Sequence, residues 1–304
     1  MAKIGVFDSG YGGLTILEAI RKELPEYDYL YLGDNARAPY GTHSFDVIYR
    51  YTLQAVQYLI DHDCALVILA CNTASAKALR TIQQKDLPLI NDQLQVIVPQ
   101  GKEITNHQSR RVNVLGVIRP TVEAVPTITK SGHIGILATP ATVSSESYVL
   151  ELEKISNVQC QMSNEQPLVV VQQACPMWVP LIESGEHLNP GADYFVEKYL
   201  REILAKDPQI DTLVLGCTHY PLLLEKINHH LEILRSRGLE IKTIAQGDLV
   251  AKSLADYLSR HPEYASQLSL DGACSYLTTE NADRFSQSAS LFLSSAIKAE
   301  HIDL

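Results

Sequence analysis

The sequence predicts an α/β protein in which mainly parallel sheets are flanked by helices. Apolar runs of strand length alternate with longer segments of helical period, an order that is typical of α/β architecture. The runs 64–70 and 210–216 lack polar alternation, as expected for strands buried on both faces of a parallel sheet. Each of these runs leads into a cysteine motif, so the two halves of the chain share one loosely repeated unit.

The expected strands are the short apolar runs, and the expected helices lie between them. Strands are predicted over 3–8, 27–32, 64–70, 94–98, 112–117, 133–138, 157–162, 210–216, 240–244 and 274–278. Helices are predicted over 14–24, 44–61, 73–85, 120–130, 141–155, 191–206, 221–235, 247–260 and 281–298. Pro140 and Pro221 suit the first turns of two of these helices. Cys71 and Cys217 are therefore both expected near helix N-termini.

The composition limits the classes of protein that the chain can represent. Its 304 residues allow two domains or one large one, and a 46% hydrophobic share is enough for a substantial core. A net charge of −10 disfavours nucleic acid and anionic membranes as partners, because both attract clustered Lys and Arg. No signal-peptide pattern, no membrane-spanning apolar run and no CxxC pair is found, which predicts a cytoplasmic protein with reduced thiols.

Two cysteines stand where apolar strands end, each followed by polar groups. Cys71 is followed by Asn72 and Thr73, and Cys217 is followed by Thr218 and His219. Open α/β folds place their ligands where a strand end leads into a helix, and a helix N-terminus favours a thiolate. One thiol from each half suggests an acid and a base that face each other across a shared site.

Two further loops also follow predicted strands. In the segment 8–15, three glycines allow the backbone to approach a ligand, and Asp8 is a candidate acid-base group or partner for a ligand ammonium. This loop lacks the GxxxxGK[ST] and GxGxxG patterns of phosphate and dinucleotide sites. The segment 34–41 is rich in turn formers, and an exposed Tyr40 could cover a small ligand there. Both segments can also be read as plain turns.

The cysteine motifs have plainer interpretations too. A core cysteine is often buried and inert. The spacing of Cys217 and His219 from Cys71 does not match the usual zinc patterns, so no metal site is predicted. A Cys–His hydrolase pair would leave Cys71 without a role. The remaining cysteines are predicted to be structural because none stands in a comparable motif: Cys64, Cys160, Cys175 and Cys274.

Taken together, the motifs resemble those of the glutamate racemases, within the aspartate/glutamate racemase superfamily. The matching segments are 8–15, 39–41, 70–74, 116–120, 138–142, 175–183, 216–222 and 276–279, spread over nearly the whole chain. The resemblance implies two similar domains, 1–115 with 245–304 and 116–244, with the active site in the cleft between them. Each domain is expected to hold a mainly parallel sheet flanked by helices.

The activity that the resemblance implies is interconversion of L- and D-glutamate without a cofactor, supplying D-glutamate for peptidoglycan. A racemase of aspartate or another amino acid on the same fold is the alternative. Members of the family commonly dimerise, so a homodimer is expected. Two other classes stay open, namely a binding module whose cysteines serve packing, and an interaction protein that uses the segment 91–111.

The resemblance also implies roles for individual residues. Cys71 resembles the base that takes the α-proton of D-glutamate, and Cys217 resembles the base that acts on L-glutamate. Asp8 is similar to the carboxylate that assists Cys71, His219 to the group that assists Cys217, and Glu183 to a further nearby carboxylate. The positions similar to substrate-binding residues are Asp8, Ser9, Pro39, Tyr40, Gly41, Asn72, Thr73, Thr139, Thr142 and Thr218.

The sequence departs from the family pattern in two places. An insertion separates the segment 87–90 from 115–118, and the polar stretch 91–111 within it predicts a surface loop around a short strand or hairpin. The triplet 245–247 reads Ala-Gln-Gly where the family usually has Asp-Ser-Gly. That loop is therefore not assigned to the site.

Overall fold

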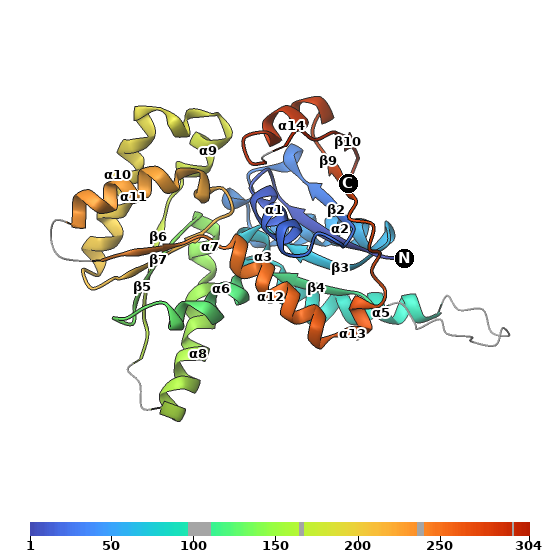
Figure 1. Ribbon diagram of the computed structural model, residues 1–304, viewed down its shortest axis with the longest axis horizontal. Helices are drawn as coiled ribbons and strands as arrows, with labels where there is room; N and C mark the ends of the chain where they lie inside the picture. The colour runs from blue at the N-terminus through green and yellow to red at the C-terminus, as the bar shows by residue number, and fades with distance from the viewer. Residues whose placement is uncertain (97–110, 164–166, 236–239, 294) are drawn as a thin grey trace.

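The computed structural model contains two parallel sheets flanked by helices (Figure 1), and it describes residues 1–96, 111–163, 167–235, 240–293 and 295–304. The larger sheet has the strand order β10-β9-β2-β1-β3-β4, and the smaller has the order β6-β5-β7-β8. The strands are β1 (Lys3–Asp8), β2 (Tyr29–Gly33), β3 (Cys64–Leu69), β4 (Asn113–Gly116), β5 (His133–Ala138), β6 (Val169–Ala174), β7 (Thr212–Gly216), β8 (Lys242–Ile244), β9 (Cys274–Thr278) and β10 (Ala299–His301). The predicted α/β class is confirmed.

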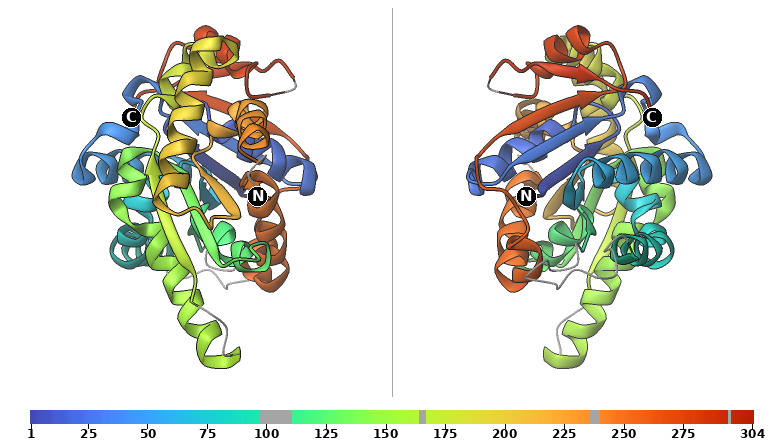
Figure 2. Two further views of the ribbon diagram at one scale, coloured as in Figure 1. Left: turned by 90° about the vertical axis from the view of Figure 1, so that its left-hand side faces the viewer. Right: turned by 90° about the vertical axis from the view of Figure 1, so that its right-hand side faces the viewer.

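At least one helix connects each pair of consecutive strands, as is usual for parallel pairing. They are α1 (Gly13–Glu23), α2 (Phe45–Asp61), α3 (Asn72–Lys77), α4 (Leu79–Thr81), α5 (Leu87–Val96), α6 (Ile118–Ala124), α7 (Pro140–Ser145), α8 (Ser147–Ser163), α9 (Trp178–Glu183), α10 (Pro190–Lys206), α11 (Leu224–Arg235), α12 (Gly247–Arg260), α13 (Pro262–Ala265) and α14 (Ala282–Ala289). Figure 2 shows that α8 extends well away from the smaller sheet. A π-helical turn, η3 (Ile82–Asp86), joins α4 to α5.

The larger sheet is buried on both faces, and successive strand residues point to opposite sides of it. On one face Val6 and Ile68 pack with α1 and α12, in a cluster that includes Leu17 and Leu254. On the other face Phe7 packs with residues of α2 and α3 in a second cluster. The continuous apolar sequence of 64–70 therefore reflects two-sided burial, as predicted.

The smaller sheet is covered in the same way. Ile136 and Val214 face α6 and α8, where Tyr148 is fully buried. Leu137 and Leu215 face the opposite side, in a cluster with residues of α10 and α11. Each sheet is thus the middle layer of a helix–sheet–helix sandwich.

Several predicted elements differ from the structure. Residues 94–96 lie in α5 and 157–162 lie in α8, so neither segment forms the predicted strand, while residues 97–98 lie outside the described residues. Strands β6 and β10 and helix α9 were not predicted, and the predicted helix over 281–298 ends at Ala289. The predicted loop over 91–111 begins as helix, and 97–110 lies outside the described residues.

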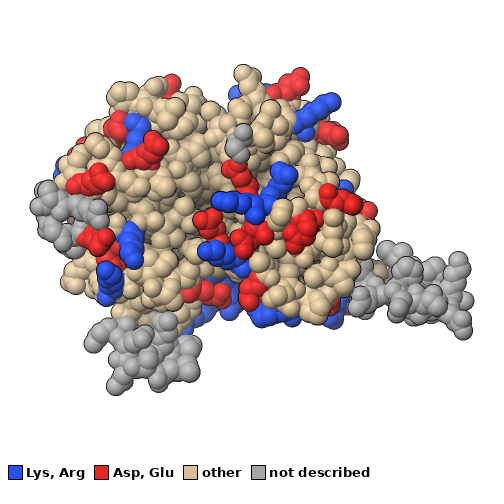
Figure 3. Space-filling model, in the orientation of Figure 1, with Lys and Arg blue, Asp and Glu red and all other residues tan. Residues whose placement is uncertain are grey.

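The chain passes from the larger sheet to the smaller after β4 and returns after β8. These crossings fall close to the predicted domain limits at 115/116 and 244/245, which remain a prediction. In the part of the chain that the structure describes, no helix is both long and apolar enough to cross a membrane. On the face in Figure 3, Lys and Arg side chains lie among Asp and Glu side chains.

Candidate active site

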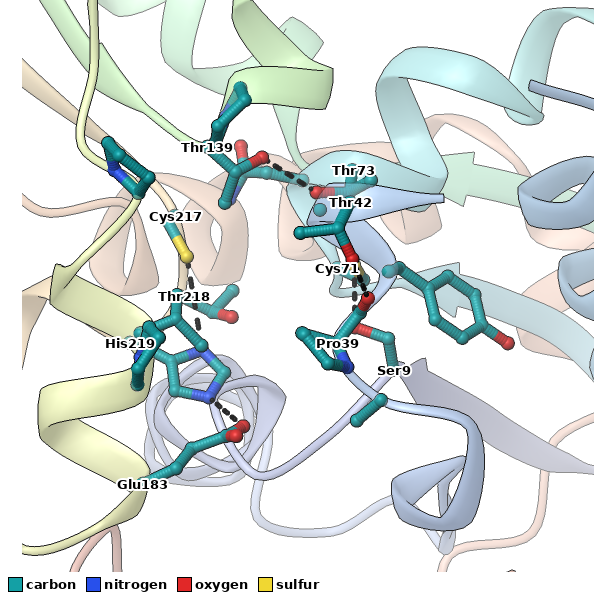
Figure 4. A pocket seen from close by; sticks show the side chains of 18 of the residues that line it. Ser9, Pro39, Thr42, Cys71, Thr73, Thr139, Glu183, Cys217, Thr218 and His219 are labelled. Carbon is teal, nitrogen blue, oxygen red and sulfur yellow. Dashed lines mark hydrogen bonds and ion pairs between the residues drawn. The ribbon is translucent and has the colours of Figure 1, made fainter. Parts of the chain in front are cut away.

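The loops that follow three strands of each sheet meet around one cavity of about 80 Å³ (Figure 4). A cavity of this volume is well above the minimum that one buried water needs, so it has room for a small ligand. The lining residues are Ser9, Ala38, Pro39, Tyr40, Gly41, Thr42, Cys71, Asn72, Thr73, Thr139, Pro140, Cys175, Pro176, Val179, Pro180, Glu183, Cys217, Thr218 and His219. None of these lining residues is a lysine or an arginine, so N–H and hydroxyl groups would have to hold an anionic ligand.

Cys71 contributes its thiol from the larger sheet, just after β3. The thiol is the N-cap of α3, and its sulfur accepts a hydrogen bond from the Ala74 N–H at 3.4 Å. Ser9 Oγ lies 3.1 Å from the same sulfur. Burial and the nearby Asp8 charge raise the pKa of Cys71 to about 12, although the Ser9 and Ala74 contacts oppose the shift. These influences favour the thiol form of Cys71 near neutral pH.

Cys217 lies on the opposite side of the cavity, just after β7 of the smaller sheet (Figure 4). Its sulfur lies 3.9 Å from Nδ1 of His219, and Nε2 of His219 lies 2.9 Å from Oε1 of Glu183. Burial opposes a charge on His219, but the contacts with Cys217 and Glu183 outweigh it and raise the pKa of His219 to about 10. An imidazolium beside Cys217 stabilises negative charge on that sulfur.

Asp8 is not among the cavity-lining residues but lies behind them, with only 1% of its surface exposed. Its Oδ2 accepts the Gly10 N–H at 2.9 Å, and its Oδ1 has no hydrogen-bond partner. Burial raises the pKa of Asp8, and the nearby His219 charge only partly opposes that rise. The carboxylate is thus placed where its charge acts on Cys71 and His219.

Three threonines join the two sheets at another edge of the cavity. Thr73 Oγ1 lies 3.0 Å from Thr139 Oγ1 and 3.4 Å from Thr142 Oγ1. Thr139 caps α7, and Pro140 occupies the first turn as predicted. Thr142 is fully buried behind Thr139 and, like Asp8, is not among the cavity-lining residues.

The loop after β2 brings Pro39, Tyr40 and Gly41 to the cavity. Asp34, fully buried, accepts hydrogen bonds from Arg37 Nε at 2.7 Å, from Thr279 Oγ1 at 2.9 Å and from the Tyr40 hydroxyl. Tyr40 is therefore buried, which corrects the expected exposed ring. Its hydroxyl donates to Asp34, although the residue lines the cavity.

The glycine-rich loop after β1 lies unusually close to the Cys217 segment. A Cβ atom at Gly12 would lie 2.3 Å from Thr218 Oγ1 and 2.4 Å from His219 Nδ1. Such distances leave no room for a side chain. The absence of a Cβ at Gly12 therefore allows the Asp8 loop of one sheet to contact the Cys217 segment of the other.

Of the predicted site residues, the structure places twelve of the fourteen in the cavity wall, all except Asp8 and Thr142. Sequence reasoning missed Ala38, Thr42, Pro140 and the wall formed by Cys175, Pro176, Val179 and Pro180. Cys175 was predicted to be structural, yet it lines the cavity. Its position at the end of β6, beside a proline, was the available signal, but β6 itself was not predicted.

No group of three His, Cys, Asp or Glu side chains suited to a metal ion occurs among the described residues. The five cysteines whose side chains are described are all free thiols. The chemically active groups that line the cavity are therefore three thiols, an imidazole and a carboxylate, with hydroxyl and N–H donors around them.

Comparisons of the sequence and of the structure with known proteins all find racemases. Residues 14–241 match the Asp/Glu/Hydantoin racemase family. Glutamate racemases of Ruegeria sp. and Dinoroseobacter shibae are 38% and 37% identical to this chain, and each alignment covers at least 98% of both chains. A glutamate racemase isoform from Bacillus anthracis has a TM-score of 0.80 at 28% identity, with 100% of this chain and 98% of that chain covered. Glutamate racemase from Francisella tularensis in complex with D-glutamate has a TM-score of 0.76 at 28% identity, covering 100% and 97%.

The fold and the site define an isomerase, and the chain belongs to the Asp/Glu/Hydantoin racemase family. It is an amino-acid racemase. The resemblance to glutamate racemases that the motifs indicated is confirmed.

Proposed function

We propose that this chain interconverts L- and D-glutamate by moving the α-proton between Cys71 and Cys217 without a cofactor. The observation that carries the proposal is the placement of the two thiols, one from each sheet, on opposite sides of a single small cavity. A reaction that inverts one carbon needs a base on one face and an acid on the other. Glutamate as the substrate is supported by the names of the curated relatives, which align over nearly their full length.

The first step from L-glutamate is proton abstraction by the Cys217 thiolate, beside the His219 imidazolium. The Cα–H bond breaks, a new S–H bond forms on Cys217, and the electron pair stays on the substrate. The Cys71 thiol then donates its proton to the opposite face, leaving a thiolate on Cys71. Conversion of D-glutamate follows the same steps in reverse, with Cys71 as the base.

The carbanion formed between these steps needs stabilisation beyond base strength. Thr73, Thr139 and Thr218 bring hydroxyl groups to the cavity, and the first N–H groups of α3 point outward from its N-terminus. A donor aimed at developing charge contributes about 3–4 kcal/mol in comparable sites. We assign these groups to the substrate carboxylates, together with Ser9, Asn72 and the backbone of Pro39 to Gly41.

The carboxylates of the site would tune the two bases. Asp8 lies close enough for its charge to raise the pKa of Cys71, and a thiolate of high pKa is a strong base once it forms. Glu183 holds His219 charged through the 2.9 Å contact. Asp8 and Thr142 do not line the cavity. We therefore propose that the charge of Asp8 acts on Cys71 through space, and that Thr142 positions the side chain of Thr139.

Water must be kept from the intermediate, because solvent would weaken the electrostatic stabilisation. Cys71 and Cys217 are only 5% and 7% exposed. Residues 38–42 and Pro140, the first residue of α7, form part of the cavity wall.

Purified protein incubated with single enantiomers of glutamate, aspartate and alanine, followed by chiral chromatography, tests the choice of substrate. The proposal predicts rapid racemisation of both glutamate enantiomers and slow or no racemisation of the other two. Faster turnover of aspartate would overturn it.

We further propose that the protein works in the cytoplasm as a homodimer and supplies D-glutamate for peptidoglycan. This proposal is supported by the sequence identity between the chain and curated glutamate racemases. Depletion in the source cell should cause lysis that added D-glutamate prevents. Sedimentation equilibrium should give twice the mass of 33.7 kDa, and a monomer mass would contradict the dimer.

A further inference from the structure

Gln246 is a buried amide that the sequence pattern left outside the site. It lies between β8 and α12, where the chain returns from the smaller sheet to the larger, and it is 2% exposed. Its neighbours come from three other segments. Oε1 accepts from Asn72 Nδ2 at 2.6 Å, and Nε2 lies 2.9 Å from the Tyr148 hydroxyl, 2.8 Å from Thr121 Oγ1 and 3.2 Å from the Val117 carbonyl.

Three of these side chains form a closed ring of hydrogen bonds. Asn72 donates to Gln246, Gln246 donates to the Tyr148 hydroxyl, and that hydroxyl donates to Asn72 Oδ1 at 2.7 Å. The direction of the ring follows from the Val117 carbonyl, which can only accept and therefore faces the Gln246 NH₂ group. All three members are at least 98% buried, so each bond lies in a low dielectric and strengthens the next.

The ring connects the Cys71 segment to both crossings between the sheets. Asn72 is the first residue of α3, directly after Cys71, and it also lines the cavity. Tyr148 belongs to α8 of the smaller sheet, and Val117 follows β4 at the first crossing. Gln246 itself occupies the second crossing. One amide thus holds the Cys71 turn against the half of the molecule that carries Cys217.

We propose that Gln246 is a positioning residue for proton transfer at Cys71. By holding Asn72 in the ring, it fixes the direction of the Cys71 thiol relative to the substrate α-carbon. The inference rests on the proposed two-thiol function. It concerns the transfer at Cys71 more than the transfer at Cys217. Asn72 directly follows Cys71, whereas the Cys217 segment meets the ring only where the aromatic ring of Tyr148 packs beside Gly216.

The test compares isotope effects on both proton transfers. Gln246→Leu keeps similar volume but opens the ring, and kcat/KM should fall roughly 10- to 100-fold, as misplacement of a reacting group typically does. The fall must be equal in both directions, because the equilibrium constant of a racemisation is fixed. The isotope effect on kcat/KM should rise for α-deuterated D-glutamate, whose deuterium Cys71 removes. It should fall for α-deuterated L-glutamate, whose abstraction by Cys217 no longer limits the rate.

A merely structural role would lower the concentration of active enzyme and leave both isotope effects at wild-type values. That result would overturn the proposal. Gln173→Leu is the matched control, since Gln173 is a buried amide bound to Glu202 outside the cavity wall, and its isotope effects should not change. If the wild-type protein does not racemise glutamate, that result contradicts the proposed function and does not test the role of Gln246.

Two further variants test the same proposal if Gln246→Leu does not fold. Tyr148→Phe removes one hydroxyl from the ring and should shift the two isotope effects in the same opposite directions. Gln246→Glu can still accept from Asn72 and donate to Tyr148 while its carboxyl is protonated. Its activity relative to wild type should therefore be high near pH 6 and fall as the pH rises. Unchanged isotope effects in Tyr148→Phe, or a flat pH ratio in Gln246→Glu, would contradict the proposal.

Discussion

Nε2 of His219 lies 2.9 Å from Oε1 of Glu183, while Nδ1 of the same ring lies 3.9 Å from Cys217 Sγ. The carboxylate is one cause of the high pKa of His219, about 10. Since the proposed mechanism needs the imidazolium, kcat/KM should fall as the pH rises through about 10. Glu183→Gln removes one of the contacts that raise the pKa, so the alkaline fall should move to lower pH.

A pH–rate profile of the Glu183→Gln variant measures that shift. Glu186→Gln serves as the control, because Glu186 is an exposed carboxylate on the neighbouring turn and does not line the cavity. An alkaline limb that stays in place in Glu183→Gln would show that Glu183 does not set the charge of His219.

Gly12→Ala should reduce racemisation strongly, because the added Cβ would meet Thr218 and His219 at 2.3 and 2.4 Å. Either the Asp8 loop or the Cys217 segment must then move, and a displacement of about 1 Å can lower the rate about 100-fold. Steady-state kinetics measure the loss. Gly191→Ala is the control, since nothing lies within 4 Å of its Cβ position, and equal activity of the two variants would contradict the close packing.

Asp8→Asn should stabilise the protein while it lowers the activity. Burial raises the pKa of Asp8 above its unfolded value, so stability is lost as the pH rises from the unfolded pKa through the folded pKa, and the full cost of the charge is present above both. One of its oxygens has no hydrogen-bond partner. At pH 8 the free energy of unfolding should be about 1–3 kcal/mol higher in Asp8→Asn.

The gain should shrink as the pH falls towards 4, because the folded carboxyl becomes protonated and the cost of its buried charge is then relieved. Urea denaturation at the two pH values provides the measurement. Equal stability of wild type and variant at pH 8 would mean that the buried charge carries no cost.

Three cysteines line the cavity, but only two are assigned to proton transfer. Cys71→Ser and Cys217→Ser should each lower racemisation by about 10²- to 10⁴-fold, the usual contribution of an acid-base group. Cys175→Ser should keep most of the activity, because the Cys175 thiol donates to the Gln173 carbonyl at 3.6 Å. Initial rates from both enantiomers separate the three variants. Near-normal turnover in either of the first two would contradict the two-base assignment.

Much of this fold could be predicted because its central strands are buried on both faces. Strands β1, β5 and β9 were predicted to the residue. The run 157–162 alternates polar and apolar residues like a strand, yet it continues α8, since a short apolar pattern does not distinguish the two states. β6 contains two adjacent glutamines before its last residue, and β10 is a three-residue edge strand with two exposed residues, so neither gave a clear signal.

The sequence predicted the site residues that follow strand ends, but not which residues lie behind the cavity wall. Cys71 and Cys217 stand where parallel strands place ligands, and their motifs pointed to the cavity. Nothing local distinguishes Asp8, which lies behind the wall, from Ser9, which lines it. Gln246 shows the same limit, because its partners Asn72 and Tyr148 lie in distant segments that only the folded chain brings together.

Solvent exchange at Cα tests the two-thiol reaction most directly. Wild-type protein is incubated in D₂O with L- or D-glutamate and no added cofactor, and the α-proton signal and the enantiomeric composition are followed by NMR and chiral chromatography. With a separate acid and base on opposite faces, deuterium should appear in the product enantiomer before it appears in the remaining substrate. Deuterium entering the substrate as fast as the product would indicate one shared base, and no exchange by the folded protein would contradict racemisation itself.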